Sequence, residues 1–121
     1  MEKFQHVLLF TLAFFISGCC TMAITKDMQL SNQSLEHIIN QDYAKAESDL
    51  NEALEVNPNN PYAVLNMGVV YQNTNRSDKA KAMYEKVIKL NPEETASKSN
   101  LDKFRGKSLV DIAKENLKTL Q

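Results

Sequence analysis

The sequence of 121 residues predicts an all-α fold of antiparallel helix pairs, and three observations support this prediction. The dipeptide Asn-Pro occurs at Asn57-Pro58 and again 34 residues later, at Asn91-Pro92. Before each dipeptide, apolar residues recur at helical spacing with charged residues between them. Signals that end one helix and begin another accompany the Asn-Pro dipeptides. We therefore expect a repeated helical hairpin.

Two segments, 41–58 and 75–92, align when the sequence is shifted by this interval. The alignment pairs residues of similar size at five positions: Ala46 with Ala80, Leu50 with Tyr84, Ala53 with Val87, Leu54 with Ile88, and Val56 with Leu90. Each set forms one apolar stripe along a helix. Each helix should end at its Asn-Pro, because proline cannot continue a helix and restricts the residue before it.

Helix starts are predicted just after these ends. Asn60 can accept hydrogen bonds from the first free N–H groups of a helix, and Pro61 suits the first helical position. Asn91 is expected to begin a further helix in the same way, with Glu93 and Glu94 at the positive end of its dipole.

The segment "PYAVLNMGVVYQNTNRSDKAKAMYEKVIKLNP" resembles the tetratricopeptide repeat (TPR), a helical hairpin with a 34-residue period. The positions that carry the resemblance are Val64, Met67, Gly68, Tyr71, Ala80, Tyr84, Val87 and Pro92. Small residues at Gly68 and Ala80 let the two helices approach closely. Asn75 stands where the family has glycine, and asparagine tolerates the left-handed conformation better than most residues.

The resemblance implies a short helical solenoid over residues 34–121. Its best repeat is 61–94, and a degenerate repeat at 27–60 has Ser34 at the glycine position and His37 at the tyrosine position. Residues 95–121 are expected to form a capping helix pair, because terminal units of stacked repeats are commonly atypical. Its first helix should carry Leu101 and Phe104.

The N-terminus is typical of an export signal. Residues 7–18, "VLLFTLAFFISG", are uncharged, and "ISGCC" resembles the lipobox of bacterial lipoproteins. This resemblance implies a signal peptide at 1–18, cleavage before Cys19, and lipidation of that cysteine. Two alternatives stay open: a short buried helix with two incidental cysteines, or an ordinary signal peptide cut nearby.

Residues 19–33 are expected to be a lipidated N-terminus and tether. Several acyl chains on one cysteine would hold the chain firmly at a membrane. In the lipoprotein sorting pattern, aspartate after the lipidated cysteine favours inner-membrane retention, and Cys20 stands there instead. We therefore expect the bacterial cell envelope, at the outer membrane facing the periplasm. No cysteine follows Cys20, so a disulfide framework and a cysteine metal site are excluded from the mature domain.

Residues for catalysis are scarce. The two histidines, His6 and His37, offer too little material for a catalytic dyad or a metal cluster. The "GKS" at 106–108 lacks the first glycine of a phosphate loop, where Leu101 stands. Net charge is −1, and no aromatic stacking platform is evident, so nucleic acid is not expected. We expect no enzyme activity, no cofactor and no metal.

Charge is unevenly distributed along the chain. Residues 27–60 carry seven acidic residues and one lysine, whereas 98–121 carry six basic and three acidic residues. Glu47, Glu52 and Glu55 are expected on a solvated helix face. Solubility explains the asymmetry, although head-to-tail self-association or an oppositely charged partner would explain it too.

The TPR resemblance implies that the first helices of successive pairs line a concave groove. With Val64, Met67, Gly68 and Tyr71 used for packing within the pair, the predicted partner-binding residues are Tyr62, Leu65, Asn66, Val69, Gln72 and Asn73. Leu65 and Val69 would form an apolar ridge. We favour an open ridge, the alternative being cover by the tether or the C-terminal helix. Candidate positions for a carboxylate clamp hold Ala96 and Asn100, which argues against a clamp.

These expectations favour a membrane-anchored adapter or assembly factor that binds a protein or peptide partner at the cell envelope. The alternative is a self-associating structural envelope lipoprotein without a dedicated peptide ligand.

Overall fold

The computed structural model describes residues 23–97 and 101–121. The predicted signal peptide at 1–18 and the predicted lipidation site at Cys19 lie outside the described residues. Within these described residues, five α-helices and one short 3₁₀ helix follow one another: α1 (Lys26–Ile39), α2 (Tyr43–Val56), α3 (Pro61–Asn73), α4 (Ser77–Leu90), η1 (Asp102–Phe104) and α5 (Leu109–Thr119). The predicted all-α fold of antiparallel helix pairs is confirmed.

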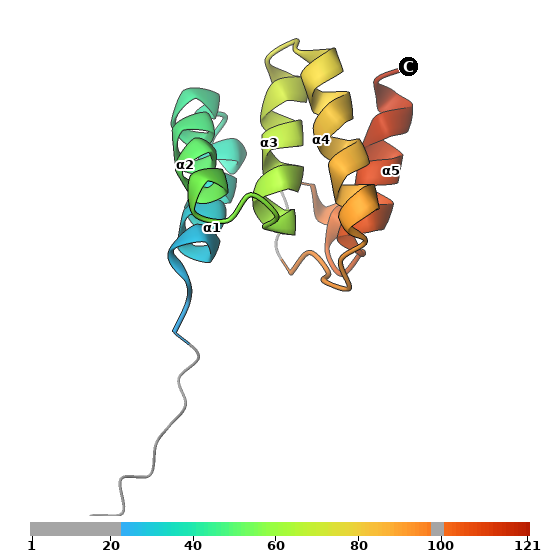
Figure 1. Ribbon diagram of the computed structural model, residues 1–121. Coiled ribbons are helices and arrows are strands. Elements are labelled where there is room, and N and C mark those ends of the chain that lie inside the picture. Colours follow the sequence, from blue (N-terminus) through green and yellow to red (C-terminus); the bar gives the residue numbers. More distant parts are fainter. Residues whose placement is uncertain (1–22, 98–100) are drawn as a thin grey trace, which may run out of the picture.

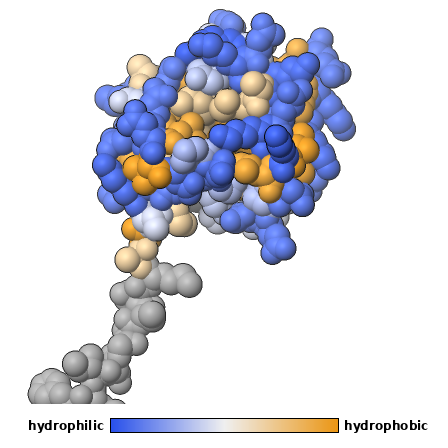
Figure 2. Space-filling view, viewed as in Figure 1, coloured by the Kyte–Doolittle hydropathy of each residue, from blue (hydrophilic) through white to orange (hydrophobic). Residues whose placement is uncertain are grey.

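The helices are stacked in chain order (Figure 1). Each α-helix packs against the next along the chain, and α3 also contacts both α1 and α5. The odd-numbered helices therefore form one layer, and α2 and α4 form the other. The face shown in Figure 2 is largely hydrophilic, with apolar residues in separate patches between the hydrophilic ones. Scattered apolar residues of this kind are normal on a protein surface.

The expected helix boundaries between the pairs are confirmed. Helix α2 ends at Val56 and α4 at Leu90, each directly before an Asn-Pro. Asn60 accepts hydrogen bonds from the backbone N–H groups of Tyr62 and Ala63, and Pro61 is the first residue of α3. Asn75 has φ 59°, the left-handed conformation expected at a position where the family has glycine.

The first helix begins earlier than expected. The tether was expected to run to residue 33, but α1 starts at Lys26. The Asp27 side chain explains the difference, because it is buried and its Oδ2 accepts hydrogen bonds from Asn57 (3.0 Å) and Asn60 (2.7 Å). These bonds attach the first turn of α1 to the turn between α2 and α3.

The capping unit is not the helix pair that we expected, and this prediction was wrong. Asn91 does not begin a helix; it is the left-handed C-cap of α4, with φ 47°. The segment after it pairs with residues before α5: the N–H of Ala96 donates to the Lys107 carbonyl, and the N–H of Gly106 donates to the Ala96 carbonyl. Because these backbone groups bond across the segment, η1 is the only helix that the described part of this stretch forms where a helix with Leu101 and Phe104 was expected.

The core consists of two clusters, one on each side of α3. Three of the five aligned pairs are fully buried, namely Ala46 with Ala80, Leu50 with Tyr84, and Ala53 with Val87. Val56, by contrast, is half exposed. Gly68 lies against the Tyr84 ring, since a Cβ atom there would be 2.5 Å from Cε1 of Tyr84. Close packing of α3 on α4 therefore depends on glycine.

Candidate functional site

A groove lies between α1, α3 and the C-terminal unit of η1 and α5. Its cavity has a volume of about 240 Å³. All six residues predicted for the binding groove line it: Tyr62, Leu65, Asn66, Val69, Gln72 and Asn73. The other lining residues are Ser31, Asn32 and Leu35 from α1, and Ala96, Leu101, Phe104, Leu109, Ile112 and Asn116 from the C-terminal unit. The prediction thus located one wall of the groove.

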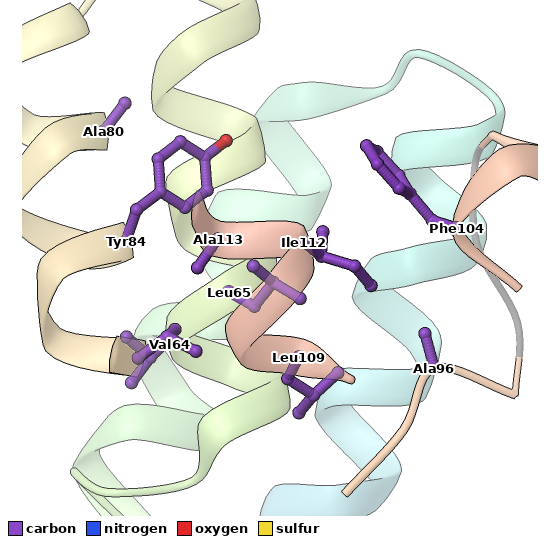
Figure 3. Packing of buried hydrophobic residues seen from close by; sticks show 10 residues of the cluster. Val64, Leu65, Ala80, Tyr84, Ala96, Phe104, Leu109, Ile112 and Ala113 are labelled. Atoms are coloured by element: carbon purple, nitrogen blue, oxygen red, sulfur yellow. The ribbon is translucent and has the colours of Figure 1, made fainter. Parts of the chain in front are cut away.

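Leu65 does not form the open apolar ridge that we favoured. Only 6% of it is exposed, and it belongs to the cluster that contains Phe104 and Leu109 (Figure 3). Val69 is half-buried and packs against both core clusters. The alternative, cover by the C-terminal part of the chain, describes Leu65 correctly. Its physical reason is that α5 takes the position beside α3 and brings Leu109 and Ile112 onto Leu65.

The polar groove residues of α3 are bonded within the protein. Tyr62 donates from its hydroxyl to the Thr95 carbonyl at 3.2 Å, and burial raises the pKa of Tyr62, which keeps the hydroxyl protonated. The Asn66 amide donates to the Ser31 carbonyl on α1 at 3.2 Å. The Asn73 amide donates to a carbonyl of its own helix. These bonds fix the side chains that border the groove.

Gln72 connects three helices. Its Oε1 accepts a 2.6 Å hydrogen bond from the Tyr84 hydroxyl of α4, and its Nε2 donates to Oγ1 of Thr119 of α5 at 2.9 Å. Burial raises the pKa of Tyr84, so the hydroxyl remains a donor. Gln72 therefore holds the far end of the groove in place, a structural role that its position on α3 alone did not indicate.

The groove lining is electrically neutral. Among the described residues that border the cavity there is no aspartate, glutamate, lysine, arginine or histidine. Ala96, one of the two positions considered for a carboxylate clamp, is buried in the groove wall, and Asn100 lies outside the described residues. The lining combines apolar side chains with amides, which suits an uncharged or apolar ligand group.

The α1 wall was missed. Asn32 and Leu35 of α1 line the groove. They share one face of the helix with Met28 and Ile39, since the four residues follow one another at steps of four, three and four residues. Met28 and Ile39 are 43% and 45% exposed, which leaves this face without cover from the described residues. The helical spacing of these residues is present in the sequence, although α1 lacks the leucine-glycine signature of the repeat.

Of the three acidic residues expected on a solvated face of α2, Glu52 and Glu55 are exposed and Glu47 is half-buried. Glu47 forms a bidentate ion pair with Arg76, at 2.7 and 2.8 Å, and these hydrogen bonds lower the pKa of Glu47. Glu52 forms an exposed ion pair with Lys26. His37 lies on the α1–α2 contact, 3.5 Å from Asp49. The described residues contain no group of three or more histidine, cysteine or acidic side chains placed to hold a metal ion.

No helix within the described ranges 23–97 and 101–121 has the length and apolar character needed to span a membrane.

Comparisons with known proteins agree with this architecture. Residues 37–99 match the family described as Tetratricopeptide repeat. Photosystem I assembly protein Ycf3 of Prochlorococcus marinus is 31% identical over 104 residues, which cover 74% of this chain and 60% of that protein. The chain thus spans less than two thirds of the relative. No solved structure matches significantly. The family match covers just over half of the chain, and the chain belongs to the tetratricopeptide repeat family.

Proposed function

We propose that this protein is a non-enzymatic adapter or assembly factor, anchored at the cell envelope through Cys19, which holds a protein partner in the groove between α1, α3 and α5. The observation that carries the proposal is the convergence of all six predicted residues on one neutral cavity. Membership of the tetratricopeptide repeat family, whose domains generally bind protein partners, supports it, as does the similarity to a protein named as an assembly protein.

The bound part of the partner is an apolar, uncharged segment. A charged group entering the cavity would lose its hydration, and the described lining has no ionised side chain to pair with it. Amide groups at the edge, above all the exposed Asn32, offer hydrogen bonds to a peptide backbone.

Partner capture with a charge placed in the groove tests the proposal. Val69→Asp introduces a carboxylate into the lining, and Val110→Asp is the matched control, because Val110 is also half-buried on a helix but does not border the cavity. We expect Val69→Asp to lower the captured partner per folded molecule at least tenfold and Val110→Asp to leave it within about twofold. Equal loss in both variants would refute the groove as the binding site.

The membrane anchor needs a separate test. We expect Cys19→Ala to yield an unprocessed or soluble species, while the unchanged chain partitions into detergent. A variant that keeps the mature mass and the detergent-phase fraction would contradict lipidation at Cys19.

The alternative function predicts a different result. If the molecular mass of the protein in solution rises with its concentration and no partner is captured, the self-associating structural protein is favoured.

A further inference from the structure

The two ends of the helix stack carry different segments of the chain. Neighbouring helices are antiparallel, so one end holds the starts of α1, α3 and α5 together with the last turns of α2 and α4 (Figure 1). We call this the entry end, because the described chain begins there at Ala23. The opposite end holds the turns 40–42 and 74–76 and the end of α5.

Exposed apolar side chains gather at the entry end. Of the five large apolar side chains that are exposed among the described residues, four lie there. Ile24 is 65% exposed, Val56 is 50% exposed and Met28 is 43% exposed, and Leu101 beside η1 is 46% exposed. Ile39, 45% exposed, is the one at the opposite end. A single exposed apolar residue needs no explanation, whereas four at one end indicate a surface that is covered in use.

The opposite end is polar by contrast. Its two turns consist of Asn-Gln-Asp at 40–42 and Thr-Asn-Arg at 74–76. The difference between the ends therefore lies in the residues and not in the helix plan, which is the same at both.

The predicted lipid anchor is close to the entry end. Between Cys19 and the start of α1 at Lys26 the chain advances by 26 − 19 = 7 residues, which span at most about 25 Å when fully extended. The first turn of α1 is fixed to the rest of the fold, because the buried Asp27 accepts hydrogen bonds from Asn57 and Asn60. An acyl chain on Cys19 would therefore keep the whole entry end near the membrane surface.

We propose that a lipid bilayer is the partner of the entry end, and that Ile24, Met28 and Val56 enter the boundary between its headgroups and acyl chains. This inference rests on the proposed function, because the anchor at Cys19 brings this end to the membrane. Ion pairs neutralise charges here, as between Lys26 and Glu52, so the contact is apolar and requires no anionic lipid.

Tryptophan fluorescence measures this contact without the protein partner. The chain has no tryptophan, so one introduced residue reports on one position of the full chain in vesicles of phosphatidylcholine. Val56→Trp reports on the entry end. Ile39→Trp is the matched control, because Ile39 is exposed to almost the same extent but lies at the opposite end. Helicity is checked for each variant.

We expect vesicles to shift the emission of Val56→Trp to the blue. Lipids brominated in their acyl chains should quench it at least about threefold more than they quench Ile39→Trp. Met28→Glu should remove this difference, since a carboxylate at the contact would have to leave water. About 0.5 M salt should change little, because the contact is apolar. Leu101→Trp is the second reporter of the entry end if Val56→Trp alters the fold.

Three results would overturn the proposal. The first is equal quenching at positions 56 and 39. The second is quenching at position 56 that Met28→Glu leaves unchanged, since the segment before α1 would then hold the domain near lipid without contact at this end. The third is a blue shift that grows with protein concentration in the absence of vesicles, which would indicate a second copy of the chain as the occupant. Partner capture by Val69→Asp is a separate readout, so failure of the groove proposal would leave these results unchanged.

Discussion

The two helix pairs share a backbone plan but fill it with different side chains. Gly68 packs against Tyr84 in α3–α4, the equivalent positions 34 residues earlier hold Ser34 and Leu50, and all four residues are buried. The second pair combines glycine with a large residue, whereas the first pair has a small residue and a medium-sized one at the same positions. The comparison teaches that the repeat conserves the space between its helices more strictly than the residues that fill it.

The pairs also differ in polarity. The buried face of α1 includes Asp27, Ser31 and Ser34, whereas that of α3 is almost entirely apolar. Ser31 and Ser34 direct their hydroxyls to carbonyls of their own helix, at 2.7 Å each. The first pair therefore adds buried hydrogen bonds of α1 to its apolar packing, whereas α3–α4 depends on packing, and the predictions below separate the two contributions.

The largest effect is expected at Gly68. Gly68→Leu forces a side chain into the space of the Tyr84 ring, and we expect it to lower the free energy of unfolding by about 3 kcal/mol or more. Urea unfolding followed by circular dichroism measures the change.

A double-mutant cycle attributes this cost to the ring. We expect Gly68→Ala alone to lower the free energy of unfolding by about 1–3 kcal/mol. In a Tyr84→Leu background, which places leucine where the first pair has Leu50, the same change should lower it by less than about 1 kcal/mol. An unchanged cost in the Tyr84→Leu background would show that the clash lies elsewhere.

A smaller loss is expected at Asp27. Asp27→Ala leaves the buried amide of Asn60 and that of Asn57 without their acceptor, which should cost about 2 kcal/mol. Asp78→Ala is the control, because Asp78 is also in a first turn but exposed, and its loss should cost about 0.5 kcal/mol. Equal values in urea unfolding would contradict a structural role for the buried carboxylate.

The Asp27 carboxylate also makes the stability of the α1–α2 pair depend on pH in the acidic range. The Thr25 hydrogen bond, with those of Asn57 and Asn60, lowers the pKa of Asp27 from its usual 3.8 to about 2 in the folded state. Because the folded pKa is depressed, the stabilisation is complete above about pH 4 and is lost as pH falls towards 2. We expect the stability difference between the unchanged chain and Asp27→Asn to shrink over that range. A difference that is constant from pH 5 to pH 2 would refute this.

The smallest effect is expected at the turns. Gln41 and Asn75, 34 residues apart, both have φ 59°. Glycine adopts this conformation without strain, so Gln41→Gly should stabilise the protein by about 0.5–1 kcal/mol and Asn75→Gly by less, since asparagine tolerates it better. Thermal unfolding would check the order, and a lower melting temperature for Gln41→Gly would contradict it.

Local signals in the sequence predicted the repeated part of the fold well. The proline positions, the Asn60 cap and the size of Gly68 each act within a few residues or within one helix pair. The C-terminal unit was mispredicted because its structure depends on bonds such as Ala96 to Lys107 and on the left-handed Asn91, which the sequence pattern does not reveal.

The groove was predicted only in part, because one wall depends on local signals and the others depend on how distant segments pack. All six predicted residues of α3 border the cavity, and partner binding at them stays a prediction. Whether Leu65 is covered depends on where α5 packs, and no property of α3 determines that. The α1 wall, which contains Asn32 and Leu35, is indicated only by the helical spacing of residues in the degenerate repeat.

Site-specific photo-crosslinking in the envelope tests the central claim, that the partner binds in the groove, most directly. A photoreactive residue at Asn32, exposed at the groove, is compared with one at Lys81, exposed on α4 away from it. We predict a discrete crosslinked protein from position 32 that Val69→Asp removes, and none from position 81. Crosslinking of the same protein from position 81 but not from position 32 would contradict the account.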